Sequence, residues 1–92
     1  MNIQWLFDII EDRKKNPTEK SYTSSLFNTG LPKIAQKVGE EGTEVVVAAL
    51  AQDDQRLIEE VADLTYHTLV LLSARGLTVA DVVAELEKRH KK

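Results

Sequence analysis

The sequence contains no cysteine and only two prolines and four glycines. The absence of cysteine excludes disulfides and thiolate metal sites. The longest apolar run, at 45–51, is far too short to span a membrane, and the apolar N-terminus lacks the basic segment that opens a signal peptide. The net charge of -3 offers no electrostatic attraction to nucleic acid. We therefore expect a cytoplasmic protein that binds neither membranes nor nucleic acid.

The overall composition indicates a single helical domain. Hydrophobic residues make up 42% of the chain and charged residues 29%, which suits a single soluble domain over residues 1–92. A chain of this size buries only a modest share of its surface, so we expect a second subunit to complete the core. The nearly all-round apolar character of 45–50 and 64–72 points the same way, because four short helices cannot cover it.

Apolar residues recur with the 3.6-residue period of amphipathic helices along four segments of the chain. Proline, glycine and capping residues mark the ends of these segments. Helices are predicted over 2–15, from Leu31 to about Ala51, from the Asp53–Asp54 pair to about Arg75, and from Thr78 onward, with a polar connection at 16–30. The predicted fold is all-α: a four-helix chain that forms a helical bundle completed by dimerisation.

Two acidic groups, EExxE at 40–44 and ExxD at 60–63, occupy the second and third predicted helices. Residues three or four apart share one face of a helix, so each group forms a stripe. The break between the two helices is short, and the helices should therefore pack antiparallel with their acidic stripes facing each other. The stripes comprise Glu40, Glu41, Glu44, Glu60 and Asp63, and His67 extends the second stripe.

Facing carboxylates are costly without a counter-charge. Two of them about 5 Å apart repel by roughly 3 kcal/mol at an effective dielectric near 20. A hard divalent cation removes this repulsion, and oxygen ligands without cysteine favour Mg²⁺ or Mn²⁺ over zinc. Because Mg²⁺ is usually held by a few carboxylates together with substrate phosphates, the expected substrate carries a polyphosphate. The alternative is a solvated acidic face.

Candidate phosphate-binding residues precede the acidic residues. Lys33 and Lys37 lie one turn apart and could hold phosphate charge, although a solvated helix face is an equal alternative. His67 could bond a carboxylate or the substrate, and its alternative role is packing. Four hydroxyl side chains lie close together in SYTSS at 21–25. Such residues either cap turns and helices or donate hydrogen bonds to phosphate oxygens, and both alternatives stay open.

Three segments resemble the phosphoribosyl-ATP pyrophosphatases: SYTSSLF at 21–27, GLPKIAQKVGEEGTEVVVAA at 30–49 and EEVADLTYHTLVLL at 59–72. That family is part of the all-α nucleotide pyrophosphohydrolases, with the MazG-like proteins and dimeric dUTPases. The resemblance covers roughly residues 20–90, and Gly42 stands where an alanine is expected. It implies a homodimer that hydrolyses 1-(5-phosphoribosyl)-ATP to 1-(5-phosphoribosyl)-AMP and pyrophosphate with Mg²⁺, the second step of histidine biosynthesis.

The resemblance also suggests roles for individual residues. Glu41, Glu44, Glu60 and Asp63 are expected to hold metal, and Glu40 either ligates or orients a water, so that these five form the catalytic set. The residues expected to contact substrate are Ser21, Tyr22, Thr23, Ser24, Lys33, Lys37 and His67. In many organisms this activity is fused to a phosphoribosyl-AMP cyclohydrolase, for which we expect no room in 92 residues, so docking to a separate cyclohydrolase is the corresponding expectation. The alternatives are a MazG-like general nucleoside triphosphate pyrophosphohydrolase and a non-catalytic helical interaction module.

Overall fold

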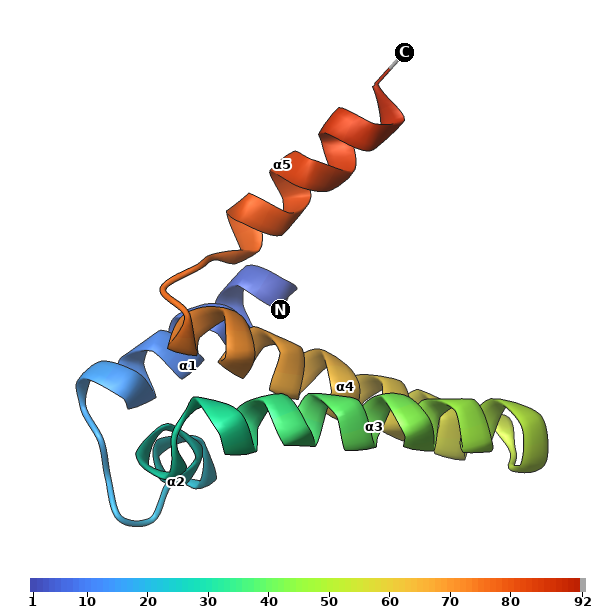
Figure 1. Ribbon diagram of the computed structural model, residues 1–92, viewed down its shortest axis with the longest axis horizontal. Coiled ribbons are helices and arrows are strands. Elements are labelled where there is room, and N and C mark those ends of the chain that lie inside the picture. The colour runs from blue at the N-terminus through green and yellow to red at the C-terminus, as the bar shows by residue number, and fades with distance from the viewer. Residues whose placement is uncertain (92) are drawn as a thin grey trace.

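This computed structural model describes residues 1–91, which contain five α-helices and no strand (Figure 1). The helices are α1 (Ile3–Lys15), α2 (Tyr22–Thr29), α3 (Leu31–Ala51), α4 (Asp54–Ala74) and α5 (Val79–His90). The predicted all-α class is confirmed. The predicted number of four helices is wrong, because α2 lies within the segment 16–30 that was predicted to be a polar connection.

Helix α2 forms because its hydroxyl side chains serve as caps rather than as loop residues. The Ser21 hydroxyl oxygen accepts a hydrogen bond from the Ser24 backbone N–H, 3.1 Å away, and so begins the helix. Gly30, at φ 97°, ends it in a conformation that glycine tolerates better than other residues. With only eight residues, α2 is too short for a hydrophobic period to identify it from sequence.

Helices α3 and α4 form an antiparallel hairpin that runs the length of the molecule (Figure 1). Helices α1 and α2 pack near the end of the hairpin where α3 begins and α4 ends. The buried apolar core lies at this end and consists of Phe7, Ile10, Leu26, Ile34, Leu69 and Val70. The opposite end of the hairpin leaves apolar side chains exposed, among them Val46, Val47, Leu50, Ile58 and Val61.

Helix α5 projects from the rest of the molecule (Figure 1). It begins with the predicted cap: the Thr78 side chain accepts from the Asp81 backbone N–H, and the Asp81 carboxylate accepts from the Thr78 backbone N–H. None of its residues is buried, so its apolar side chains at Val82, Val83 and Leu86 face outward. Within residues 1–91, no helix has the length and hydrophobicity needed to cross a membrane.

Candidate metal and phosphate site

Carboxylates from α3 and α4 meet near the middle of the hairpin. One oxygen each from Glu41, Glu60 and Asp63 lies within 4.8 Å of the other two, and we call these three residues the acidic site. Glu41 and Glu60 are buried, at 7% and 5% exposure, whereas Asp63 is exposed. The predicted meeting of the two acidic stripes is therefore confirmed.

The two buried carboxylates have unpaired oxygens. Neither Oε2 of Glu41 nor Oε2 of Glu60 has a hydrogen-bond partner among the described residues. Burial of a charged oxygen without a partner costs free energy, so such groups usually pair with a cation or bind a metal. Because Mg–O bonds are about 2.1 Å long, an ion spans oxygens up to about 4.2 Å apart, which requires only small rotations from the present separations. The acidic site therefore fits a divalent cation.

Glu44 lies beside the acidic site, whereas Glu40 lies outside it. The interaction with the neighbouring Glu44 carboxyl, followed by burial, raises the pKa of Glu60, while Arg56 opposes the shift. Two neighbouring carboxyls retain a proton more readily than one alone. Glu40 is exposed, and its Oε2 accepts a hydrogen bond from the Gln36 amide at 3.3 Å. The predicted ligand Glu44 is thus adjacent to the site.

Lys37 and His67 both approach Glu41. The Lys37 Nζ lies 3.9 Å from Glu41 Oε1, and the His67 Nδ1 lies 3.8 Å from the same oxygen. His67 Nδ1 also lies 2.9 Å from the Asp63 carbonyl oxygen. Since a carbonyl oxygen only accepts, Nδ1 carries a proton, and the other ring nitrogen, Nε2, forms a hydrogen bond of 3.1 Å with the Tyr22 hydroxyl. His67 thereby links α2 to the acidic site.

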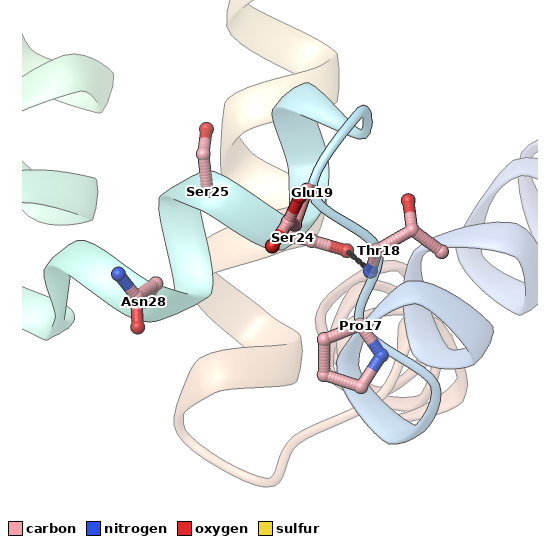
Figure 2. Close-up of a pocket in the computed structure, with 6 residues that line it drawn as sticks. All are labelled: Pro17, Thr18, Glu19, Ser24, Ser25 and Asn28. Atoms are coloured by element: carbon pink, nitrogen blue, oxygen red, sulfur yellow. Dashed lines mark hydrogen bonds between the residues drawn. The ribbon is translucent and has the colours of Figure 1, made fainter.

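The SYTS hydroxyls divide into two pairs. Ser21 caps α2, and the Ser24 hydroxyl accepts from the Thr18 backbone N–H and donates to the Arg13 carbonyl, so both are engaged in the local structure. Tyr22 and Thr23 instead contact α4, where the Thr23 hydroxyl bonds that of Tyr66. Figure 2 shows Ser24 bonded to Thr18 in a separate hollow between α2 and the preceding loop. Lys33 is exposed, one turn before Lys37.

Arg56 was not predicted from the sequence. Its guanidinium donates to Glu59 and, at 2.5 Å, to Oε1 of the buried Glu60. Arg56 also lines a hollow of about 290 Å³, which we call the Arg56 hollow; its lining residues are Glu44, Val47, Gln52, Arg56 and Glu60. The i,i+4 spacing from Arg56 to Glu60 was the available sequence signal, since such pairs face each other on a helix.

The sequence profile of the phosphoribosyl-ATP pyrophosphohydrolase family matches residues 4–90. The chain belongs to this family. The family resemblance found in the three sequence segments is thereby confirmed over nearly the whole chain. Within this phosphoribosyl-ATP pyrophosphohydrolase domain, both helices that supply the acidic site lie inside the matched region.

Curated relatives agree with the family assignment. The chain is 51% identical to a phosphoribosyl-ATP pyrophosphatase of Clostridium botulinum, over 98% of this chain and 82% of that protein. It is 54% identical to the enzyme of the same name from Lacticaseibacillus casei, over 99% of this chain and 83% of that protein. It is also 49% identical, over 90% of its length, to 40% of a histidine biosynthesis bifunctional protein HisIE of Xylella fastidiosa. The chain thus matches less than half of that bifunctional protein.

Proposed function

We propose that this protein hydrolyses 1-(5-phosphoribosyl)-ATP to 1-(5-phosphoribosyl)-AMP and pyrophosphate, the second step of histidine biosynthesis. The observation that carries the proposal is a pair of buried glutamates, Glu41 and Glu60, in a member of the phosphoribosyl-ATP pyrophosphohydrolase family. Each has an oxygen without a hydrogen-bond partner in the part of the chain that the structure describes. The names of the curated relatives support the same substrate and pathway. An anionic triphosphate would be repelled by these carboxylates alone, which supports a cation between them.

The proposed cation is Mg²⁺, with Mn²⁺ as an alternative of similar ligand preference. Glu41, Glu60 and Asp63 would hold it, and Glu44, which lies beside Glu60, would join them. When bound, the metal neutralises phosphate charge and lowers the pKa of a coordinated water. Glu40, exposed one residue before Glu41, is proposed to orient a water at the edge of the site.

Substrate contacts are proposed on the α2 side of the acidic site. Lys37 is close enough to Glu41 to hold phosphate beside the metal, and Lys33 would extend this positive charge by one turn. Tyr22 and Thr23, which reach α4 from α2, are suited to contact the ribose or adenine portions. His67 would orient Tyr22 and Glu41. Ser21 and Ser24, with their hydroxyls bonded within the chain, are assigned a structural role instead.

A homodimer is proposed because apolar side chains remain exposed at the end of the hairpin and along α5. A cytoplasmic location is proposed from the family's role in histidine biosynthesis. The bifunctional relative supports a working association with the next enzyme of the pathway, and we propose docking to a separate phosphoribosyl-AMP cyclohydrolase.

The decisive experiment measures pyrophosphate release from phosphoribosyl-ATP with Mg²⁺ and after chelation of the metal. We expect release only with the metal, and much slower release from ATP and other nucleoside triphosphates. Equal turnover of ordinary triphosphates would instead identify a general nucleotide pyrophosphohydrolase of the MazG-like type. No release from any triphosphate would overturn the enzymatic proposal and leave a helical interaction module.

A further inference from the structure

Arg56 and Lys37 lie on opposite sides of the acidic site. Lys37 precedes Glu41 by one turn on α3, and Arg56 precedes Glu60 by one turn on α4. Because α3 and α4 are antiparallel, the residues that precede each glutamate lie toward opposite ends of the hairpin (Figure 1). Lys37 is therefore on the α2 side, and Arg56 is on the side of the hairpin turn. A chain of phosphates along the hairpin would meet a cation at each end.

The Arg56 side chain retains capacity to bind an anion. A guanidinium has five N–H donors, and the bonds to Glu59 and Glu60 use two of them. The Arg56 side chain is 47% exposed, so its ion pairs contribute little to stability by themselves. Its planar fork matches the geometry of phosphate oxygens better than a lysine ammonium does.

The Arg56 hollow opens directly beside the acidic site. Glu60 belongs to both, its side chain is only 6% exposed, and its Oε2 has no partner among the described residues. The hollow has a volume of about 290 Å³ and is open to solvent, so a phosphate group can enter it. Arg56 supplies the positive charge of this hollow, and Glu44 and Glu60 supply the carboxylates that a shared cation would neutralise.

We propose that Arg56 is a substrate-binding residue that holds the terminal phosphates, the group released as pyrophosphate, in the Arg56 hollow. The triphosphate then lies along the α3–α4 hairpin, with its nucleotide end toward Lys37 and α2. This inference rests on the proposed function, which identifies the anion as the triphosphate of phosphoribosyl-ATP. It goes further by giving the orientation of the triphosphate along the hairpin and a phosphate contact outside the acidic motif.

The test compares the binding of the two products, measured by calorimetry with Mg²⁺ present. Inorganic pyrophosphate and phosphoribosyl-AMP are titrated separately into the wild type, Arg56→Gln, Arg56→Lys and the matched control Arg89→Gln. Arg89 makes an equivalent i,i+4 pair with Glu85 on α5 and is exposed. We expect Arg56→Gln to weaken pyrophosphate binding at least about tenfold, since bonds to charged groups are strong, and Arg56→Lys to lie between it and the wild type.

The same titrations contain the results that would overturn the proposal. Phosphoribosyl-AMP affinity should be unchanged in Arg56→Gln, and equal weakening of both products would show a general disturbance of the site. The Mg²⁺-dependent rise in melting temperature should also persist in this variant, because its loss would mean that Arg56 acts only by positioning Glu60. Unchanged pyrophosphate binding, or none in the wild type, would reject the contact outright. If the wild type binds pyrophosphate through Arg56 and yet hydrolyses no phosphoribosyl-ATP, the proposed function fails and the Arg56 contact stands.

Discussion

Burial distinguishes the glutamates of the acidic site from the other acidic residues of the same helices. Glu41 and Glu60 each have one buried oxygen that finds no hydrogen-bond partner within residues 1–91, whereas Glu40 faces water and bonds a glutamine. Water stabilises an exposed carboxylate, but a buried one depends on the charges around it. We therefore expect the residues that are proposed to bind the cation to reduce the stability of the metal-free protein.

Replacing Glu41 with glutamine should separate metal binding from folding. Wild-type protein should gain about 2.7 kcal/mol of stability at a Mg²⁺ concentration 100 times its Kd, because the metal binds only the folded state. Glu41→Gln should lose most of this gain while its metal-free melting temperature stays equal to the wild type or rises. Thermal melts with Mg²⁺ and with chelator measure both quantities. The control Glu40→Gln should keep the metal-dependent gain, and a full gain in Glu41→Gln would show that Glu41 is not a ligand.

The raised pKa of Glu60 gives the metal-free protein a specific pH dependence. The Glu44 carboxyl is the main cause, burial adds to it, and Arg56 opposes it. Between the ordinary value of 4.5 and the raised pKa, folded Glu60 keeps a proton that the unfolded chain has lost. The contribution of this group to the free energy of unfolding is therefore greatest at low pH and falls as pH rises through that window.

Urea unfolding of metal-free protein across this pH range measures the effect. Glu44→Gln removes the largest cause of the shift, so we expect it to flatten the decline in stability relative to the wild type. With saturating Mg²⁺ the slope should reverse, because the metal binds the deprotonated carboxylates. An identical pH profile in Glu44→Gln would mean that Glu44 does not raise the pKa of Glu60.

Lys37→Met should reduce catalysis more than it reduces stability. The Lys37 Nζ is 3.9 Å from Glu41 and its side chain is 29% exposed, so the ion pair itself contributes little. We expect a clear loss of kcat/KM for phosphoribosyl-ATP, because a phosphate contact is lost, with nearly unchanged melting. If the metal-free protein melts far lower while the Mg²⁺-loaded protein does not, Lys37 is a counter-ion of Glu41 instead. Steady-state kinetics and paired melts distinguish the two roles.

Among the elements, the predictable ones were those with long, regular patterns. Helices α3 and α4 were predicted nearly to their ends, since each has 21 residues with an apolar stripe. The EExxE and ExxD spacings also predicted that acidic groups would meet. The helix α2 was missed because its Ser and Thr residues favour turns and helix caps alike. The Arg56 hollow and the contact between Tyr22 and His67 depend on how separate helices pack, which residue spacing does not determine.

A pair of serines in α2 tests whether its hydroxyls support the fold or the substrate. Ser24→Ala removes a buried hydroxyl that joins the Thr18 N–H to the Arg13 carbonyl, so we expect a loss of about 1–3 kcal/mol in unfolding free energy. Ser25→Ala is the matched control, because its exposed hydroxyl bonds only the Tyr22 carbonyl within α2. The KM of both variants should match the wild type. A raised KM in Ser24→Ala without a loss of stability would indicate that the Ser24 hydroxyl contacts the substrate.

At the scale of the whole molecule, the exposed apolar side chains of the hairpin end and of α5 support the proposed homodimer. We expect light scattering at micromolar concentration to give about twice the chain mass of 10.3 kDa. Leu86→Asp places a charge on the exposed apolar face of α5 and should shift the protein toward monomer if that face lies in the dimer. Glu87→Asp, one residue on, is a control that keeps the charge. A monomer mass in a well-folded wild type would reject the dimer.

The hairpin also affects how quickly the acidic site can assemble. Its three carboxylates lie between residues 41 and 63, on consecutive helices joined by Gln52 and Asp53. Closing so short a stretch of chain costs little loop entropy, and chains dominated by such local contacts fold fast. The carboxylates therefore approach one another as early as the hairpin itself forms. Dissolved Mg²⁺ is then expected to raise the folding rate as well as slow unfolding, because it offsets their repulsion already in the transition state.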